Sequence, residues 1–213
     1  MNTANLTAMR YHTALGEKYA RNHIFVDLAS QGSRILELGC ADGFITRHLV
    51  ERGCTVTGME LDAEAARHAK KWCENVFVCD LNRPGWSSML GCTFDTVLCG
   101  DVLEHLADPW STLREVSRVL SKDGRVIISL PNIANLRIRL NLLMGQFNYQ
   151  TGGILDITHL RFFTLKTARA LIEESGYRIV SFHPVVGGRF TRQIRLLFPK
   201  LFAVQMIFVV VPA

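Results

Sequence analysis

The first two thirds of the chain alternate between two hydrophobic periods. Short apolar runs rich in β-branched residues predict buried strands over residues 33–38, 55–59, 76–79, 95–99 and 125–130. Helical spacing of the apolar residues between these runs predicts helices over residues 44–52, 62–73 and 108–120. This alternation predicts an α/β fold made of βαβ units, with a parallel sheet and helices on both of its faces.

The pattern changes after Pro131. Residues 132–149 mix aliphatic side chains with arginines, and the glycine pair Gly152 and Gly153 follows. A glycine pair permits hinge motion, so residues 131–165 are expected to form a lid over a ligand site.

The two ends of the chain complete the predicted domain. A helix over residues 164–175, capped by Thr164, is followed by predicted strands over 178–182 and 204–211. Residues 6–30 have helical spacing, so the segment 1–30 is expected to form a helical cap over the ligand edge of the sheet. The 213 residues suit a single domain.

Composition excludes a disordered chain, because hydrophobic residues make up 48% and charged residues 20%. The net charge of +5 is unevenly spread, since residues 131–213 hold ten Lys or Arg and three Asp or Glu. A basic third of this kind suits an anionic acceptor, an acidic membrane surface or RNA. A solvated basic face is the alternative interpretation.

The cysteines and the apolar runs indicate the cellular compartment of the protein and whether it crosses a membrane. The six cysteines form no CxxC pair, and the N-terminus lacks the apolar run of a signal peptide, so a reducing, cytoplasmic environment is expected. The longest apolar run, residues 201–211, is too short to span a bilayer, so we expect no transmembrane segment. A buried final strand is the favoured interpretation. Contact with a membrane surface and homodimerisation through this stretch are the alternatives.

Acidic residues stand at the ends of three successive predicted strands, where ligands bind in open α/β sheets. Glu37 ends the first strand, ahead of a turn with two glycines, and it would repel a pyrophosphate but suit a ligand with a positive amino group. Glu60 follows Gly43 by 17 residues, a position suited to a ribose diol. Asp80 would accept a hydrogen bond from an exocyclic amine, and Leu81 would pack on a purine ring.

Four stretches carry a resemblance to a known family: ILELGCADGFITRHL, VTGMELD, VFVCDL and FDTVLCGDVLEHLADPWSTLREVSRVLSKDGRVIISLPN. Together they cover roughly residues 33–132 and resemble the class I S-adenosylmethionine-dependent methyltransferases. The resemblance implies a seven-stranded, mostly parallel sheet with helices on both faces and an antiparallel last strand beside the sixth. It implies S-adenosylmethionine as cofactor, bound by Glu37, Gly39, Cys40, Ala41, Gly43, Glu60, Leu61, Asp80, Leu81 and Asp101. The family often has glycine where this chain has Ala41.

A second cluster points to the acceptor. After the fourth strand, a helical turn would place Asp101, Glu104 and His105 on one face. His159 stands in a second polar stretch, DITHLRFFT, before the helix that Thr164 caps. Two carboxylates and two histidines suit a Mg²⁺ or Mn²⁺ ion, so Asp101, Glu104, His105 and His159 are candidate metal ligands.

This segment also has resemblances of its own. The Asp101-x-x-Glu104-His105 spacing resembles that of small-RNA 2′-O-methyltransferases and ubiquinone-biosynthesis O-methyltransferases, although the former have Glu where this chain has Asp101. The combination PNIAN…GILDITHLRFFT resembles bacterial glycan, lipid and secondary-metabolite methyltransferases. Catalytic roles for His105 and His159 follow in two forms, metal-assisted transfer and metal-free general base catalysis. Purely structural roles remain a third interpretation.

The leading functional hypothesis is O-methylation of a hydroxyl on a small-molecule or glycan-type acceptor. RNA 2′-O-methylation is an alternative, but the chain shows no appended RNA-binding module and a nucleic-acid partner is not expected. A cofactor-binding scaffold that transfers no methyl group is a second alternative hypothesis. Four arginines would meet an anionic group on the acceptor, namely Arg161, Arg189, Arg192 and Arg195. Cys40 is expected to be a packed residue, with a reactive thiolate at a helix start as the alternative.

Overall fold

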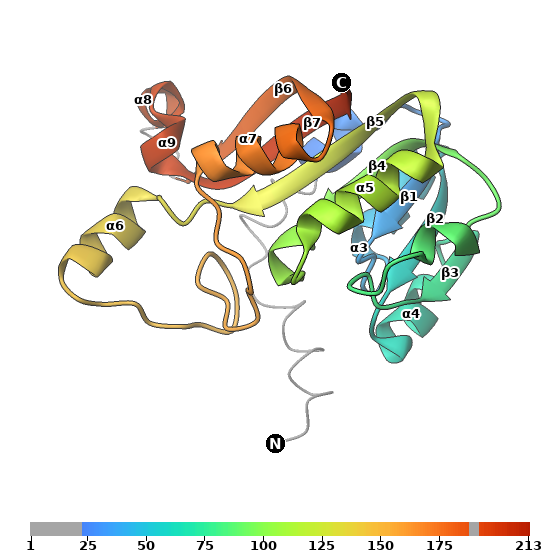
Figure 1. Ribbon diagram of the computed structural model, residues 1–213, viewed down its shortest axis with the longest axis horizontal. Coiled ribbons are helices and arrows are strands. Elements are labelled where there is room, and N and C mark those ends of the chain that lie inside the picture. The colour runs from blue at the N-terminus through green and yellow to red at the C-terminus, as the bar shows by residue number, and fades with distance from the viewer. Residues whose placement is uncertain (1–22, 188–191) are drawn as a thin grey trace.

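Seven strands form one sheet in the part of the chain that the computed structural model describes, residues 23–187 and 192–213 (Figure 1). Their order is β3-β2-β1-β4-β5-β7-β6, and β7 lies antiparallel to both of its neighbours while β1 to β5 pair in parallel. The predicted mostly parallel sheet with an antiparallel last strand is therefore confirmed. The strands are β1 (Arg34–Leu38), β2 (Thr55–Glu60), β3 (Asn75–Val78), β4 (Phe94–Gly100), β5 (Leu120–Pro131), β6 (Tyr177–Val186) and β7 (Ala203–Pro212).

Helices cover both faces of the sheet, as predicted. Alternate side chains of β1 divide between the faces: Leu36 belongs to the core cluster that contains Leu113 and Leu171, whereas Ile35 belongs to the cluster that contains Leu49. Figure 1 shows α5 and α7 side by side on the near face. The helices are α3 (Phe44–Glu51), α4 (Ala63–Ala69), α5 (Pro109–Val119), α6 (Leu136–Leu143), α7 (Leu165–Glu174), α8 (Arg192–Leu197) and α9 (Pro199–Phe202), with the 3₁₀ helices η1 (Trp86–Met89) and η2 (Leu103–His105).

Several boundaries differ from those the sequence predicts. β5 begins at Leu120 because that residue already pairs with Phe94 of β4. β6 continues past residue 182 to Val186, and Pro184 is tolerated there because β6 is an edge strand. Helices α8 and α9 occupy a stretch to which the pattern assigned no element.

The N-terminal helical cap is described only in part. Residues 1–22 lie outside the described residues, and residues 23–28 are helical. Phe25 is buried, and its ring would lie 3.7 Å from a Cβ at Gly100, the last residue of β4. This helix therefore reaches the carboxyl end of the sheet, where the ligand edge is expected.

The apolar C-terminal run is a buried strand. Met206, Ile207, Phe208 and Val210 of β7 are fully buried between β5 and β6. These side chains are covered by the chain itself, which fits the favoured interpretation of a buried final strand, while homodimerisation stays a prediction. Among the described residues, no helix is both long and apolar enough to cross a bilayer.

All six cysteines are free thiols. Four of them, Cys40, Cys54, Cys73 and Cys99, are buried in the core. The cytoplasmic location expected from the cysteines stays a prediction.

The packing of α7 generates a stability prediction. Leu171 of α7 is fully buried, so Leu171→Ala is expected to lower the free energy of unfolding by about 2–5 kcal/mol through a lost apolar contact and a cavity. Leu143→Ala, at a position that is 84% exposed on α6, is the matched control and is expected to change it by less than about 0.5 kcal/mol. Urea unfolding followed by circular dichroism measures both, and equal losses would contradict this account of the core.

Candidate active site

The loop between β1 and α3 is tied to the end of β2. The amides of Gly39 and Cys40 both donate to the Met59 carbonyl, at 2.8 and 3.1 Å, and the Ala41 amide donates to Glu60 Oε2 at 2.9 Å. These hydrogen bonds hold the predicted cofactor loop against Glu60, the acidic residue at the end of β2.

Three residues of this loop have positive φ. Gly39 and Gly43 have φ of 70° and 85°, and a Cβ at Gly43 would lie 2.9 Å from the Trp72 side chain, so glycine is required there. Ala41 has φ of 50°, a left-handed conformation that is strained for alanine, which is a physical reason for glycine at this place in the related family. The adjacent Asp42 has a buried Oδ1 without a hydrogen-bond partner among the described residues.

Glu37 is buried beneath the loop, at the end of β1. Its Oε2 accepts a 2.5 Å hydrogen bond from Thr46 Oγ1 of α3. Burial raises the pKa of Glu37 to about 8, while the Thr46 hydrogen bond opposes the shift. A buried carboxyl of this kind regains its charge when a cation approaches, which suits the positive amino group expected there.

Cys40 is a packed core residue. Only 2% of its surface is exposed, and a Cβ at Gly58 would lie 2.5 Å from its Sγ, so the thiol fills the space left by that glycine. A hydrogen bond with the Cys73 thiol, together with burial, raises the pKa of Cys40. The alternative of a reactive thiolate is therefore wrong, and only the backbone of Cys40 remains available to a cofactor.

Glu60 uses most of its hydrogen-bonding capacity within the chain. Oε1 accepts from the amides of Leu61 and Asp62 at 2.8 and 2.9 Å, in addition to the Ala41 bond at Oε2. A carboxylate has about four lone-pair sites, so one site on Oε2 remains for a hydroxyl. The carboxylate thus organises the loop and retains capacity for a ribose hydroxyl.

A cavity of about 370 Å³ opens beside the ends of β2 and β3. Leu61, which is 65% exposed, and Asp80 both line it, whereas Leu81 is nearly buried. Asp80 Oδ1 accepts from the backbone amide and side-chain amide of Asn82 at 3.0 and 3.2 Å. The remaining lining residues are Val78, Cys79, Arg83, Pro84, Gly85, Trp86 and Met89.

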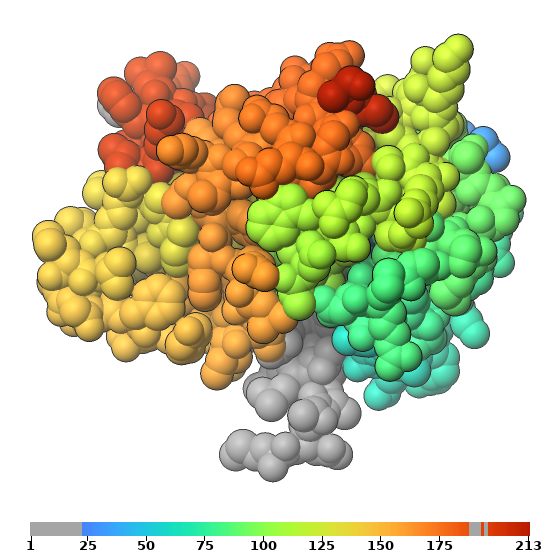
Figure 2. Space-filling view, in the orientation of Figure 1, coloured from blue at the N-terminus to red at the C-terminus, as the bar shows by residue number. Residues whose placement is uncertain are grey.

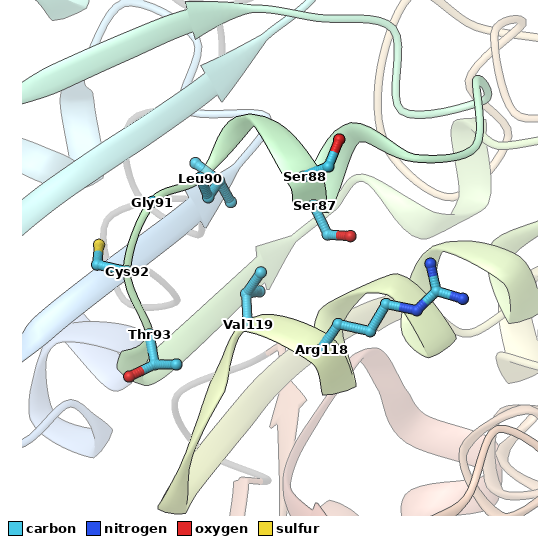
Figure 3. A pocket seen from close by; sticks show the side chains of 8 residues that line it. All are labelled: Ser87, Ser88, Leu90, Gly91, Cys92, Thr93, Arg118 and Val119. Atoms are coloured by element: carbon cyan, nitrogen blue, oxygen red, sulfur yellow. The ribbon is translucent and has the colours of Figure 1, made fainter.

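A second cavity, of about 390 Å³, lies away from these residues (Figure 3). It is lined by η1, the loop before β4 and the end of α5, and Thr93 and Val119 directly precede β4 and β5. This cavity therefore lies at the amino ends of strands, opposite the edge that carries the acids. Its lining contains none of the predicted site residues.

Asp101 follows β4 and links three strands. It has φ of 55°, which Asp tolerates better than most residues. Its Oδ1 accepts a 2.5 Å hydrogen bond from Ser129 Oγ of β5 and another from Gln205 Nε2 of β7. The predicted helical face shared with Glu104 and His105 is wrong, because η2 begins only at Leu103. The sequence pattern gave no signal for Ser129 or Gln205.

The segment containing His159 is held against η2 by backbone hydrogen bonds. The amides of Leu160 and Arg161 both donate to the Glu104 carbonyl, at 2.8 and 3.0 Å. Asp156 Oδ1 accepts from the amide and hydroxyl of Thr158, at 2.8 and 2.6 Å, so Asp156 shapes the turn that precedes His159. Residues more than fifty positions apart are thereby brought together.

Three predicted residues gather at this contact. Glu104, His105 and His159 offer ligand atoms that all lie within 4.8 Å of one another. The imidazole rings of the two histidines meet edge to face, with centroids 4.8 Å apart. Asp101, the fourth predicted metal ligand, lies outside this group.

Backbone carbonyls orient both imidazoles. His105 Nδ1 lies 3.2 Å from the Thr158 carbonyl, and His159 Nδ1 lies 3.2 Å from the Ile154 carbonyl. A carbonyl can only accept, so we assign the proton to Nδ1 of each neutral ring and leave the lone pair on Nε2. His159 Nε2 lies 3.9 Å from Glu104 Oε1, and both of these side chains are almost completely buried.

Burial lowers the pKa of His159 below its usual 6.5, and the nearby His105 lowers it further. His159 is therefore neutral at pH 7 and presents an unprotonated Nε2 toward the Glu104 carboxylate. Such an arrangement is ready to receive a proton or a cation.

Val102, which precedes this cluster in the chain, contacts the predicted cofactor loop. A Cβ at Gly39 would lie 3.2 Å from Cγ2 of Val102, so the segment before η2 rests on the loop after β1. The predicted cofactor loop and the predicted acceptor segment thus meet at the carboxyl ends of β1 and β4.

Of the four predicted anion-binding arginines, the structure describes the side chain of Arg161. The guanidinium of Arg161 donates to the Ala107 carbonyl at 2.6 and 3.2 Å and lies over the Trp110 ring. Arg189 lies outside the described residues, and Arg192 and Arg195 are placed only as part of α8. An anionic acceptor therefore stays a prediction.

Comparisons with known proteins agree with this geometry. A family model described as a methyltransferase domain matches residues 10–182. The ubiquinone biosynthesis O-methyltransferase of Aeromonas salmonicida is 31% identical over 118 residues, which are 54% of this chain and 49% of that protein. The chain thus spans about half the length of the curated relatives that it matches.

Solved structures share the fold at low identity. A TehB-like methyltransferase from Corynebacterium glutamicum has a TM-score of 0.65 and 20% identity, with full coverage of both chains. The 1,6-didemethyltoxoflavin-N1-methyltransferase of Burkholderia thailandensis, with S-adenosylhomocysteine bound, has a TM-score of 0.64 and 18% identity, covering 94% of this chain and 80% of that one. With the family model, these likenesses show that the chain belongs to the class I S-adenosylmethionine-dependent methyltransferases.

Proposed function

We propose that this protein transfers the methyl group of S-adenosylmethionine to a hydroxyl oxygen of a small-molecule acceptor. The observation that carries the proposal is the group formed by Glu104, His105 and His159, the first two of which closely follow Val102, the residue that contacts the loop after β1. Several relatives are ubiquinone biosynthesis O-methyltransferases, which supports a hydroxyl as the acceptor. A glycan-type acceptor bearing the same hydroxyl group remains within this proposal.

The described residues fit the cofactor. Glu60 keeps a lone pair for a ribose hydroxyl, the cavity beside Asp80 and Leu61 offers about 370 Å³, and the buried Oδ1 of Asp42 is an acceptor without a partner in the described chain. The raised pKa of Glu37 allows this buried carboxyl to ionise when an amino group approaches. These features support binding of the nucleoside by the β2 and β3 ends and of the amino acid by the β1 end.

The protein's task in the reaction is to position the acceptor and take its proton. S-adenosylmethionine supplies an activated methyl group, so the acceptor oxygen needs alignment and deprotonation rather than covalent help. Neutral His159 takes the proton at Nε2, and the Glu104 carboxylate, 3.9 Å away, stabilises the imidazolium. His105, held by the Thr158 carbonyl, presents a second imidazole beside it.

The same three residues fit a divalent cation. Metal-binding histidines commonly donate their other N–H to a backbone carbonyl, as His105 and His159 do here. Two imidazole nitrogens and a carboxylate are ligands that Mn²⁺ accepts, with Mg²⁺ favouring the oxygen. We infer that Glu104, His105 and His159 hold such an ion, which would lower the pKa of the acceptor hydroxyl.

Cofactor binding is tested at Glu60. Glu60→Gln removes the charge from the oxygen that faces the ribose, so the dissociation constant for S-adenosylhomocysteine is expected to rise about tenfold or more. Glu64→Gln, at an exposed position on α4, is the matched control and should leave affinity unchanged. Isothermal titration calorimetry measures both. Equal affinities for the two variants would contradict the ribose role, and binding without turnover on any acceptor would favour a scaffold.

The histidine role predicts a pH profile. Only neutral His159 can take a proton or bind a metal, so the rate should stay level from pH 8 to about 6.5 and fall at lower pH, through the lowered pKa of His159. His159→Ala is expected to reduce kcat by about 10²–10⁴-fold, while His68→Ala, exposed on α4, should not. Initial rates with labelled methyl donor and a panel of hydroxyl acceptors provide the measurement. A rate that keeps its level below pH 5 would argue against both histidine mechanisms.

Chelation separates the two mechanisms. With the metal in place, EDTA should lower the rate about tenfold or more, and added Mn²⁺ or Mg²⁺ should restore it. Mn²⁺ electron paramagnetic resonance should show a bound ion that Glu104→Gln releases. Full activity in EDTA would contradict the metal proposal and leave His159 as a metal-free base.

A further inference from the structure

Helix α6 carries large apolar side chains that the rest of the described chain leaves uncovered. Ile138 is buried and anchors the helix, while Leu140, Leu142, Leu143 and Met144 are each half or more exposed. Leu143 reaches 84% exposure, unusual for leucine in a folded domain.

The turn between α8 and α9 adds to this apolar surface. Leu197 is 74% exposed and the neighbouring Phe198 is 55% exposed. Asn135, the cap of α6, donates through Nδ2 to the Phe202 carbonyl at the end of α9, at 3.3 Å. Figure 2 shows α6 in yellow and α8–α9 in red at the same end of the molecule. We call these residues the α6–α9 surface: Leu140, Leu142, Leu143, Met144, Leu196, Leu197 and Phe198.

Positive charge accompanies these apolar residues. Arg137 and Arg139 are exposed on α6, Lys200 is exposed on α9, and neither α6 nor the stretch 192–202 contains an acidic residue. The acids nearest to α6 in sequence, Asp123 and Asp156, are both 13 residues from its ends. The α6–α9 surface is therefore both apolar and basic.

We propose that the α6–α9 surface docks on an anionic lipid bilayer. Leucine, methionine and phenylalanine side chains insert at the boundary between head groups and acyl chains, and arginine and lysine pair with anionic head groups. A second copy of this chain would oppose like charges, and a nucleic acid would leave Leu143 and Phe198 unburied. A bilayer of anionic lipid satisfies both features of the surface.

Docking has a consequence for the acceptor, which rests on the proposed function. Ile157 and Leu160, on either side of His159, are also about 60% exposed, so apolar side chains are exposed beside the acceptor cluster as well. The acceptor class that fits is a membrane-borne amphiphile with a hydroxyl group, whose apolar part remains in the bilayer.

Vesicle sedimentation of the full-length chain tests the proposal. The wild-type protein should sediment with vesicles of equimolar phosphatidylglycerol and phosphatidylcholine, much less with phosphatidylcholine alone, and less as salt increases. The double substitution Leu143→Glu and Met144→Glu should weaken binding to the anionic vesicles at least about tenfold. Val180→Glu, which replaces an exposed apolar residue of β6 outside the surface, is the control and should bind like wild type.

Three outcomes would overturn the docking proposal. The first is wild-type protein that stays in the supernatant, and the second is a double variant that binds vesicles like wild type. The third is self-association of the wild-type protein, seen by sedimentation velocity without vesicles and abolished by the double substitution. Salt-sensitive binding to a single-stranded RNA oligonucleotide, unaffected by the double substitution and without vesicle binding, would assign the basic surface to nucleic acid. Calorimetry with S-adenosylhomocysteine, run without vesicles, reports the proposed function separately, so the two failures are distinguishable.

Discussion

The backbone carbonyl of Glu104 is the contact on which the whole site depends. It accepts the amides of Leu160 and Arg161 and so joins the segment after β4 to the segment before α7. Together with the contact between His105 Nδ1 and the Thr158 carbonyl, these two hydrogen bonds hold the segment of His159 beside η2. The side chain of Glu104 faces His159 from the same residue, so one position both holds the lid segment and completes the polar cluster.

The sheet explains why this contact forms at the cofactor edge. Parallel strands present their carboxyl ends on one side, and β1, β2 and β4 end there in Leu38, Glu60 and Gly100. β7 lies between β5 and β6, and its Gln205 donates through Nε2 both to Asp101 and to Ser129. The acceptor side is thereby braced by strands distant in sequence.

Much of this arrangement could be predicted from the sequence. Buried strands with β-branched runs and acids at their ends are local signals, so Glu37, Glu60 and Asp80 were predicted at one edge. The contacts of Asp101 were not predictable, because they depend on its left-handed backbone and on Gln205, more than one hundred positions away. Periodicity cannot report either a single residue's φ or a pairing between distant strands.

Whether the side chains of other predicted residues are accessible to a ligand depends on their burial, which a sequence motif does not specify. Cys40 lies in the motif that binds the cofactor, yet the absence of a side chain at Gly58 lets its thiol turn into the core. Leu81 follows Asp80 but is nearly buried, whereas Leu61 is exposed beside the cavity. The direction of each side chain depends on the packing of neighbouring strands, and that packing is set by residues outside the motif.

The two halves of the chain differ in the sign of their charge and in what they leave exposed. Among the acids of the first half, Glu60 and Glu37 stand at strand ends, where backbone amides engage Glu60 and Thr46 engages Glu37. Three of the ten basic residues after Pro131, namely Arg137, Arg139 and Lys200, are exposed on helices α6 and α9, among uncovered leucines. A soluble acceptor alone would need neither the exposed leucines nor the arginines beside them. The separation of a recessed acidic edge from a basic, apolar surface therefore favours a protein whose cofactor arrives from water and whose acceptor arrives from a bilayer.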